Sequence, residues 1–322
     1  MSKNTKIWLI IAVSLITLGI ILFTGLMITL KFDFKKLSTT NKQTNYYAIT
    51  EVFSGITINT NTADVNFIES SDGSVSVTCF EEEKEKHNVL VANGVLVIQI
   101  NDTRKWFDYI SLFNFKKPKI TVSIPKGEYG ALIINASTGD ISVPNAFKFE
   151  SATVEVSTGD VDFSSSTMGL LKISGSTSEV NIFDLTADEI DVSVSTGEID
   201  VTNVTCNKNF SLKVSTGDSE IKKVTCGNLT TTGSTGDIEL EEVIAREKLS
   251  IQRSTGDVDF SGCDAGEVII ETDTGDVEGS FKTEKIFFAT SDTGRVNVPE
   301  SLTGGKCVIK TETGKIIVSI KS

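Results

Sequence analysis

The feature that most constrains this chain is a five-residue motif that recurs at an almost constant interval. Residues 137–141 are STGDI, and related motifs follow up to the end of the chain. Measured at the glycine position, successive copies lie 20, 19, 19, 20, 19, 20, 19, 19 and 20 residues apart. So regular a period predicts a repeat architecture in which each unit packs on its neighbours. The later copies occupy residues 157–161, 176–180, 195–199, 215–219, 234–238, 254–258, 273–277, 292–296 and 312–316.

Each repeat predicts two strands that are joined by a tight turn. In the second repeat, residues 153–156 (TVEV) and 161–163 (VDF) alternate apolar and polar side chains, which is the period of a strand. Between them, glycine adopts a positive φ at little steric cost. One unit cannot bury its apolar side alone, whereas equivalent strands stacked about 4.8 Å apart bury it as a continuous column. The repeat therefore predicts an all-β fold, a β-solenoid of stacked coils with 19–20 residues each.

Two other all-β architectures fit this repeat less well. A propeller blade needs about 40 residues, and a sandwich would not keep one register through ten copies. An earlier partial copy, residues 61–67 (NTADVNF), lies four periods of 19 before the first full motif, and we interpret it as a degenerate start of the same solenoid. We expect a β-rich start with insertions over residues 49–130 and regular repeats over residues 131–322.

The β-rich start contains a hairpin signal and two interruptions. Asn93-Gly94 separates two alternating apolar runs, which strongly favours a hairpin. Residues 81–86 (EEEKEK) are a charge run that we expect to be a solvated loop, with His87 exposed beside it. Residues 104–119 carry five aromatic side chains between basic flanks, typical either of a segment that covers the first coil or of a membrane or partner contact. This candidate patch consists of Arg104, Lys105, Trp106, Phe107, Tyr109, Phe113, Phe115, Lys116 and Lys117.

One segment near the N-terminus has the length of a membrane span. Residues 7–30 carry no charge, and a helix of this length is long enough to cross about 30 Å of hydrocarbon. A cleaved signal peptide is the alternative, but no A-x-A-like site follows the apolar run. We expect one transmembrane helix with its flanks over residues 1–36, then a polar spacer over residues 37–48. Lysines flank both ends of the helix, and the short N-terminal tail favours a signal anchor with the C-terminal part outside the cytoplasm.

Charge and residue usage exclude several classes of function. The chain has 43 Asp and Glu against 30 Lys and Arg, a net charge of −13, which argues against nucleic-acid binding and favours cationic partners. The single histidine argues against a His-based metal site or catalytic triad. The five cysteines form no C-x-x-C pair, which argues against a zinc site and a disulfide framework. Cys206 and Cys226 share one phase of the repeat, and we expect buried free thiols rather than a disulfide there.

Stacking places the acidic residue of each motif along one edge of the solenoid. Three interpretations stay open: hydrogen bonding within each turn, Ca²⁺ binding and attraction of cationic peptides or polymers. A polysaccharide-cleaving enzyme needs two carboxyls in distinct environments, whereas these acids are uniform and the coils carry almost no insertions. We therefore expect no catalytic residue, no resident metal and no cofactor. The acidic column consists of Asp140, Asp160, Glu179, Glu198, Asp218, Asp237, Asp257 and Asp276.

A family resemblance rests on the repeat together with the segment that leads into it. Residues 124–127 (IPKG) precede an apolar run at residues 132–134 and then the repeated S-T-G-D-[IV]-x-[VF] pattern. Over residues 49–322 this resembles the bacterial "putative adhesin" family of β-strand-repeat proteins, a domain of unknown function. The resemblance implies a bacterial envelope role without catalysis, since members occur in cell-envelope proteins and some are linked to envelope-stress and antimicrobial-peptide responses. The chain departs from the pattern at Ser178, Arg295 and Lys315.

These observations together favour a membrane-anchored interaction module of a bacterial envelope that senses or sequesters cationic ligands in a stress response. An adhesin or structural spacer is the alternative, and a carbohydrate-active enzyme is the third hypothesis. The repeats end at residues 316–320, so we expect open strand edges there, with charge from Lys310, Lys315 and Lys321 to limit edge pairing. Self-association through this C-terminal coil and contact with other envelope proteins are further possibilities that the pattern leaves open.

Overall fold

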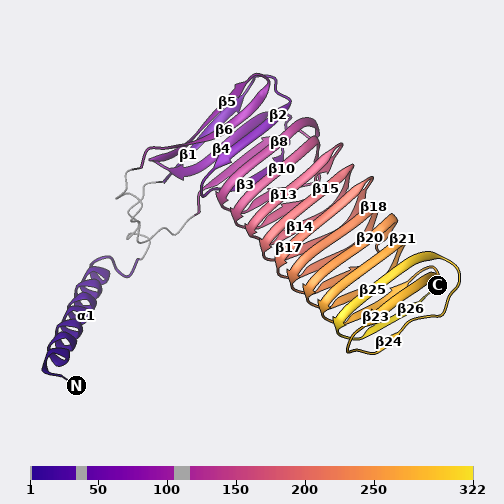
Figure 1. The fold of residues 1–322 in the computed structure, drawn as a ribbon. Helices are drawn as coiled ribbons and strands as arrows, with labels where there is room; N and C mark the ends of the chain where they lie inside the picture. Colours follow the sequence, from indigo (N-terminus) through magenta and orange to yellow (C-terminus); the bar gives the residue numbers. More distant parts are fainter. Residues whose placement is uncertain (1, 34–41, 105–116, 322) are drawn as a thin grey trace.

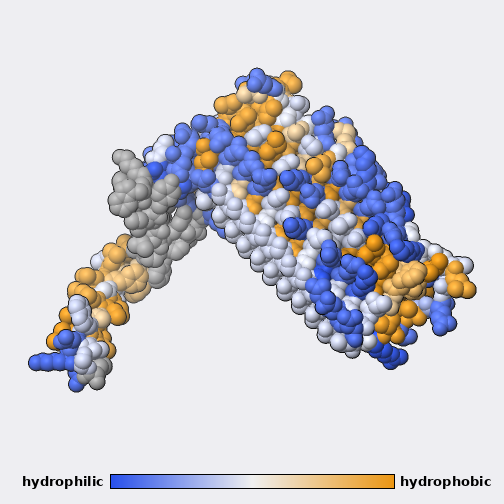
Figure 2. Space-filling model, viewed as in Figure 1, coloured by the Kyte–Doolittle hydropathy of each residue, from blue (hydrophilic) through white to orange (hydrophobic). Residues whose placement is uncertain are grey.

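The computed structural model describes residues 2–33, 42–104 and 117–321, as one N-terminal helix followed by a long β-solenoid (Figure 1). Helix α1 (Lys3–Thr29) begins at the cap residue Ser2, whose side chain accepts the Thr5 N–H at 3.2 Å. The helix is long and apolar enough to cross a membrane, and its surface is hydrophobic along most of its length (Figure 2). The predicted apolar helix is confirmed, and it starts four residues before the charge-free run because Ser2 supplies an N-cap.

The N-terminal part of the solenoid contains stacked parallel strands and further strands that pair antiparallel with their neighbours. The partial repeat at residues 61–67 belongs to the stack, because β2 and β3 pair in parallel with β8 and β9 on one side and with β6 and β7 on the other. The predicted hairpin is confirmed, since β5 and β6 are antiparallel and Asn93 and Gly94 have φ of 53° and 75°. The strands are β1 (Lys42–Ile49), β2 (Gly55–Thr60), β3 (Asp64–Glu69), β4 (Val75–Glu82), β5 (Glu85–Ala92), β6 (Val95–Asp102) and β7 (Lys119–Ile124).

Two expectations for this part need correction. The segment expected to be a spacer, residues 37–48, forms strand β1 from Lys42 onward, and β1 pairs antiparallel with β4. The charge run at residues 81–86 is the end of β4 and the start of β5 rather than a solvated loop, and Glu81 and Glu85 are 1% and 3% exposed. Alternate residues of a strand face inward, so a run of charges that continues a strand must bury every second one.

The regular part is a stack of parallel coils in register, with local shifts near Cys226, Ala245 and Phe260. Each strand pairs with the equivalent strand of the next coil, as Val154 pairs with Ile134 on one side and Ile173 on the other. The strands are β8 (Gly127–Thr138), β9 (Ile141–Val143), β10 (Phe147–Thr158), β11 (Val161–Phe163), β12 (Ser166–Thr167), β13 (Leu170–Thr177), β14 (Val180–Ala187), β15 (Glu189–Thr196), β16 (Ile199–Cys206), β17 (Asn209–Thr216), β18 (Ser219–Thr235), β19 (Ile238–Glu241), β20 (Ile244–Thr255) and β21 (Val258–Thr274).

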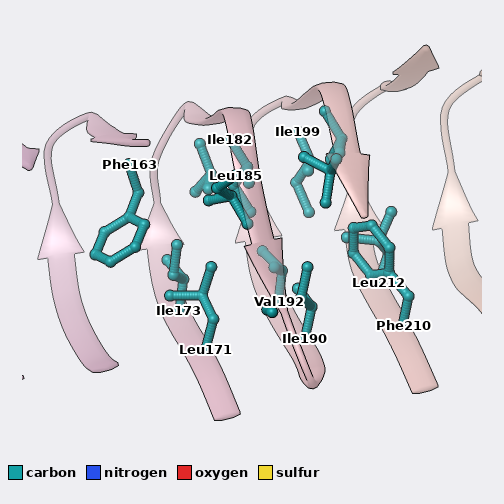
Figure 3. Packing of buried hydrophobic residues seen from close by; sticks show 14 of the residues in the cluster. Phe163, Leu171, Ile173, Ile182, Leu185, Ile190, Val192, Ile199, Phe210 and Leu212 are labelled. Carbon is teal, nitrogen blue, oxygen red and sulfur yellow. The ribbon is translucent and has the colours of Figure 1, made fainter. Parts of the chain in front are cut away.

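One continuous apolar core runs along the inside of the stack. In the coil that contains β15 and β16, Ile190, Val192, Ile199 and Val201 are fully buried. Figure 3 shows such side chains from neighbouring coils pointing toward one another between the strands. The alternation of apolar and polar residues therefore decides which side chains enter the core, as the repeat predicted. Burial of apolar area contributes about 25 cal/mol per Å², and each coil adds such area only by contact with the next.

Every coil turns at two corners, of which the motif marks only the first. At the first corner the turn glycine lies against the preceding turn, and a Cβ at Gly236 would collide with the Gly217 carbonyl oxygen. Gly236 also has a φ of +128°, which glycine alone adopts without strain. At the second corner a left-handed residue recurs with the same period as the motif. These residues are Asp184, Asn203, Lys223, Glu242 and Gly262, with φ between 53° and 60°.

The last two coils stack in the reverse of their chain order. Strand β25 lies between β21 and β23, since Cys307 pairs with Val268 on one side and Phe287 on the other. Likewise β26 lies between β22 and β24. The expectation of open edges at residues 316–320 therefore holds only in part: β23 and β24 form the terminal coil of the described stack (Figure 1), but β24 pairs only with residues 316 and 317 of β26. The C-terminal strands are β22 (Val277–Phe281), β23 (Lys285–Ser291), β24 (Val296–Asn297), β25 (Gly305–Thr313) and β26 (Ile316–Ile320).

Candidate functional site: an acidic ribbon along the turns

The acidic residues of the motif bind the next coil rather than their own turn. Asp218 Oδ1 accepts the Asp237 N–H at 2.8 Å, and Asp237 Oδ1 accepts the Asp257 N–H at 2.8 Å. The same bond recurs from Asp64 at the N-terminal end to Asp276, which accepts the Lys315 N–H at 2.9 Å. The hydrogen-bonding interpretation therefore holds in a modified form, in which the column is a ladder between coils. The remaining steps of the ladder run from Asp140, Asp160 and Asp257.

The ladder is interrupted in the middle of the described stack. Glu179 and Glu198 take the aspartate position there, and neither accepts an N–H from the following turn among the described residues. A glutamate side chain is one methylene longer, so its carboxylate extends past the neighbouring N–H. These two carboxylates therefore lack the constraint that holds the aspartates.

A second column of acids runs beside the first, two residues further along each coil. Asp200 pairs in register with Glu220, and Glu239 pairs with Asp259, on the outward side of the second strand. We call the two columns together the acidic ribbon. It comprises Asp140, Asp160, Asp162, Glu179, Glu198, Asp200, Asp218, Glu220, Asp237, Glu239, Asp257, Asp259, Asp276 and Glu278.

The carboxylates of the ribbon raise one another's pKa. The charge of Asp200 is the largest cause of the raised pKa of Glu198. For Asp200 and Asp259, partial burial is the largest cause, and the neighbouring carboxylates add to it. Like charges spaced by one strand separation, about 4.8 Å, disfavour the ionised form. The middle of the ribbon therefore carries electrostatic repulsion that a cation bound nearby would reduce.

Lysines neutralise the two ends of the ribbon. Lys117 lies 3.1 Å from Asp140. Burial would raise the pKa of Asp140, but the hydrogen bond from the Asp160 N–H and the contact with Lys117 together lower it. At the other end Lys315 contacts Asp276 at 3.3 Å and Glu278 at 2.5 Å. Within the ribbon, Lys222 contacts Glu220. The exposed negative charge therefore concentrates between these ends. The expected column is confirmed as an alignment, while its binding role stays a prediction.

A groove also lies on the outer face of the first strands, away from the ribbon. It has a volume of about 660 Å³ and is lined by amides and hydroxyls such as Asn59, Gln99 and Ser174. Among its described lining residues the single carboxylate is Glu155. A glycosidase site needs a pair of carboxyls about 5–9 Å apart. The groove therefore does not provide the acid pair that a polysaccharide-cleaving enzyme requires.

His87, expected to be exposed, is buried with Glu81 and Cys79 at the N-terminal end of the solenoid. His87 Nδ1 lies 2.7 Å from Glu81 Oε2, and His87 Nε2 lies 3.0 Å from the Thr60 hydroxyl. Asn45 donates to the other Glu81 oxygen at 2.5 Å. The metal-binding atoms of the three residues lie within 4.8 Å of one another. However, both ring nitrogens and both carboxylate oxygens already have partners, which favours a structural network.

The cysteines confirm the expectation of buried free thiols. All five are buried and unpaired with one another. Burial raises the pKa of Cys79 and of Cys226 to about 12, so these thiols stay protonated. A thiolate is the form that binds metal or acts as a nucleophile. The thiols therefore behave as small apolar groups of the core.

The aromatic patch falls largely outside the described residues. Of its nine members, the structure describes Arg104 and Lys117. Arg104 contacts Glu85 and Asp102 at 2.7 Å each, and Lys117 contacts Asp140. The prediction of a cap or a contact patch stays a prediction for the others. They are Lys105, Trp106, Phe107, Tyr109, Phe113, Phe115 and Lys116.

Sequence reasoning missed the second acidic column. Its signal is present, because the residue two positions after the motif acid is itself acidic in most repeats, as in Asp160 and Asp162 or Asp218 and Glu220. Period-2 alternation places both side chains of such a pair outward. The buried Glu81–His87 pair had no comparable signal, because the charge run around it resembles a loop.

The chain matches a known family over most of its length. The family described as "Toastrack DUF4097" matches residues 53–209 and 186–316. This chain belongs to the Toastrack DUF4097 family. The finding agrees with the resemblance inferred from the repeat and the IPKG segment. No protein with a curated description matches the chain.

Similar solved structures include proteins from Bacteroides and Parabacteroides. A putative adhesin from Bacteroides fragilis is 17% identical, with 87% of this chain and 97% of that chain covered and a TM-score of 0.41. A putative adhesin from Parabacteroides distasonis is 14% identical, with 87% and 98% covered and a TM-score of 0.47. A putative lipid binding protein from the same species is 20% identical, with 75% and 98% covered and a TM-score of 0.43.

Proposed function

We propose that this Toastrack protein is a non-catalytic, membrane-anchored module of a bacterial cell envelope that binds cationic ligands along its acidic ribbon. The observation that carries the proposal is the raised pKa of Glu198, Asp200 and Asp259 within two aligned columns of acids. A polycation laid along the ribbon would face one carboxylate pair per coil, about 4.8 Å apart. Its charges would reduce the repulsion that the folded chain otherwise retains.

The anchor and the net charge support the same proposal. Helix α1 is long enough to hold the chain at a membrane, and a net charge of −13 attracts cations over the range of the Debye length, about 8 Å at physiological salt. We place the solenoid outside the cytoplasm. Protease added to intact protoplasts should then digest residues 42–321 without lysis. Protection until lysis would place the solenoid in the cytoplasm and exclude an envelope ligand.

Binding of a fluorescent oligolysine peptide to the full chain in detergent micelles tests the ligand class. We expect binding that weakens steadily as salt is raised, because exposed charge pairs are screened. Replacing three acids of the strand column, Asp200→Asn, Glu239→Gln and Asp259→Asn, should weaken affinity roughly tenfold at low salt. These three leave the hydrogen-bonded ladder intact, because none of them accepts a turn N–H among the described residues.

A matched control removes three carboxylates from the other side of the coils. Glu150 and Glu155 lie on β10 and Asp191 on β15, away from the ribbon. Glu150→Gln, Glu155→Gln and Asp191→Asn change the net charge by the same amount. Equal loss of binding in both triple variants would mean that net charge alone attracts the peptide, and it would contradict a binding site on the acidic ribbon. Attachment to whole cells or polymers without salt dependence would instead favour an adhesin or spacer.

A further inference from the structure

The core of the solenoid contains one charged side chain that has no charged partner. Arg253 occupies an inward position of β20 and is 2% exposed. Its Nη2 donates to the Ser219 hydroxyl at 3.3 Å. Its Nε and Nη1 have no hydrogen-bond partner among the described residues. Uncompensated burial of a cation is strongly unfavourable, so this arginine needs an explanation.

The surrounding sequence makes room for the guanidinium. The inward position before Arg253 in the stack is Gly233, where a Cβ would collide with Arg253 Nη1. Ser219 stands where the neighbouring coils have Ile199 and Ile238. Thr231 stands where they have Leu212 and Ile251. Three positions have thus lost apolar volume around one arginine.

These groups present hydrogen-bond donors and no anionic acceptor. The Thr231 hydroxyl oxygen is buried and also lacks a partner among the described residues. Ser219 accepts from Arg253, so its own proton is free to donate. Burial lowers the pKa of Arg253 and outweighs the opposing charges of Asp218 and Asp237, which lie on the outward turn, where each Oδ1 accepts a backbone N–H. The guanidinium keeps its charge in proteins and so requires a counter-charge.

We propose that Arg253, Ser219 and Thr231 form an internal binding site for a small monovalent inorganic anion of the size of chloride. An anion accepts from the free N–H groups and from both hydroxyls, and it balances the charge. A water molecule would accept the free hydrogen bonds of this site, but it would not neutralise the charge of the guanidinium. A Cβ at Gly233 would lie 2.6 Å from the Val214 carbonyl oxygen, so the interior is closely packed here and favours a small anion over phosphate or sulfate. This site is independent of the acidic ribbon and of the proposed function.

Halide dependence of thermal unfolding tests the site. The full chain in detergent is refolded without halide and then melted in sodium chloride, sodium bromide or sodium gluconate at equal ionic strength. The melting temperature should be higher in either halide and should rise with the logarithm of halide concentration, as for any ligand of the folded state. Equal melting temperatures in halide and gluconate would overturn the proposal.

Two variants separate the site from a general salt effect. Arg253→Met should abolish the halide dependence, whereas Arg246→Met, which removes an exposed arginine bonded to the Asn207 carbonyl, should keep it. If Arg253→Met does not fold, Thr231→Val removes one donor at constant shape and should reduce the dependence. Halide shifts of unchanged size in both the Arg253 and Thr231 variants would contradict the site. In bromide-soaked crystals an anomalous peak should lie beside Arg253, and a peak elsewhere would indicate an adventitious ion only.

Discussion

At the scale of single residues, the motif performs two tasks that belong to neighbouring coils. Its glycine allows close approach of one turn to the next, and its aspartate accepts the next turn's N–H. Ser178 is the exception in the glycine position and does not have a positive φ. Its side chain fills the space left by Gly175, where a Cβ would lie 2.6 Å from the Ser178 hydroxyl oxygen. One irregular turn is therefore compensated three residues earlier, at an inward position of the same coil.

The ladder predicts a difference between two substitutions at Asp237. Asp237→Ala removes the acceptor of the Asp257 N–H and should lower the free energy of unfolding by about 1 kcal/mol. Asp237→Asn keeps an oxygen in the same position and should cost much less. Urea unfolding followed by circular dichroism measures both. Equal losses for the two variants would show that charge, rather than the hydrogen bond, stabilises the turn.

At the scale of elements, the C-terminal strands enter the stack between two coils that precede them in the chain. The turn glycines follow the same order, since Gly314 lies against Gly275 and Gly294 lies against Gly314. Ion pairs also span the inserted contact, with Lys310 3.3 Å from Glu271 and Lys306 3.5 Å from Glu267. Each pair joins residues 39 apart, which is two periods.

Charge reversal tests this order. Glu271→Lys and Lys310→Glu should each lower the free energy of unfolding by about 0.5–1 kcal/mol, and the double variant should recover most of the loss. If the last two coils were stacked in the order of the chain, the two side chains would be two strand separations apart, about 10 Å. The losses of unfolding free energy in the two single variants would then add in the double variant. The control pairs Glu271→Lys with Lys213→Glu on the same face several coils away, where additivity is expected.

At the scale of the whole molecule, packing of the apolar core stabilises the fold, whereas repulsion between the carboxylates of the ribbon destabilises it. Helix α1 and the core are apolar, whereas the ribbon concentrates acid on one edge of the solenoid. The folded-state pKa values of Glu198, Asp200 and Asp259 lie above their ordinary values. At pH values between the ordinary pKa of each carboxyl and its raised pKa in the folded state, the folded chain binds more protons than the unfolded chain. The free energy of unfolding therefore falls as pH rises through this range.

The pH dependence of unfolding follows from these shifts. The melting temperature should rise as pH is lowered from 7 toward the ordinary carboxyl values near 4. Below that range it should fall, because the pKa values of Asp140 and Asp276 are lowered by their contacts. Asp200→Asn should raise the melting temperature at pH 7 and flatten the profile, whereas Asp191→Asn on the other face should change neither. A profile that is flat from pH 7 to 5 in the unaltered chain would contradict this account.

Much of the architecture is local in origin and was predictable. The 19–20-residue period, the alternation along each strand and the Asn93-Gly94 turn all act within one repeat or between adjacent residues. The acid column follows from the same period. The second corner, at Asp184 and its equivalents, carries varied residue types, so no motif marks it. The second acidic column was visible only when outward positions were compared between repeats.

The sequence by itself determined the apolar N-terminal helix, the solenoid and its core, because hydrophobic period and turn chemistry are properties of short segments. Tertiary structure alone decided the order of the last two coils, since equivalent repeats offer each other nearly the same edge and chain order does not rank them. Tertiary structure also decided which of the charged side chains that interrupt the apolar pattern are buried and which groups they contact. Glu81, His87 and Arg253 are buried because strand alternation carries them inward, and only their spatial neighbours supply the partners or the space that each requires.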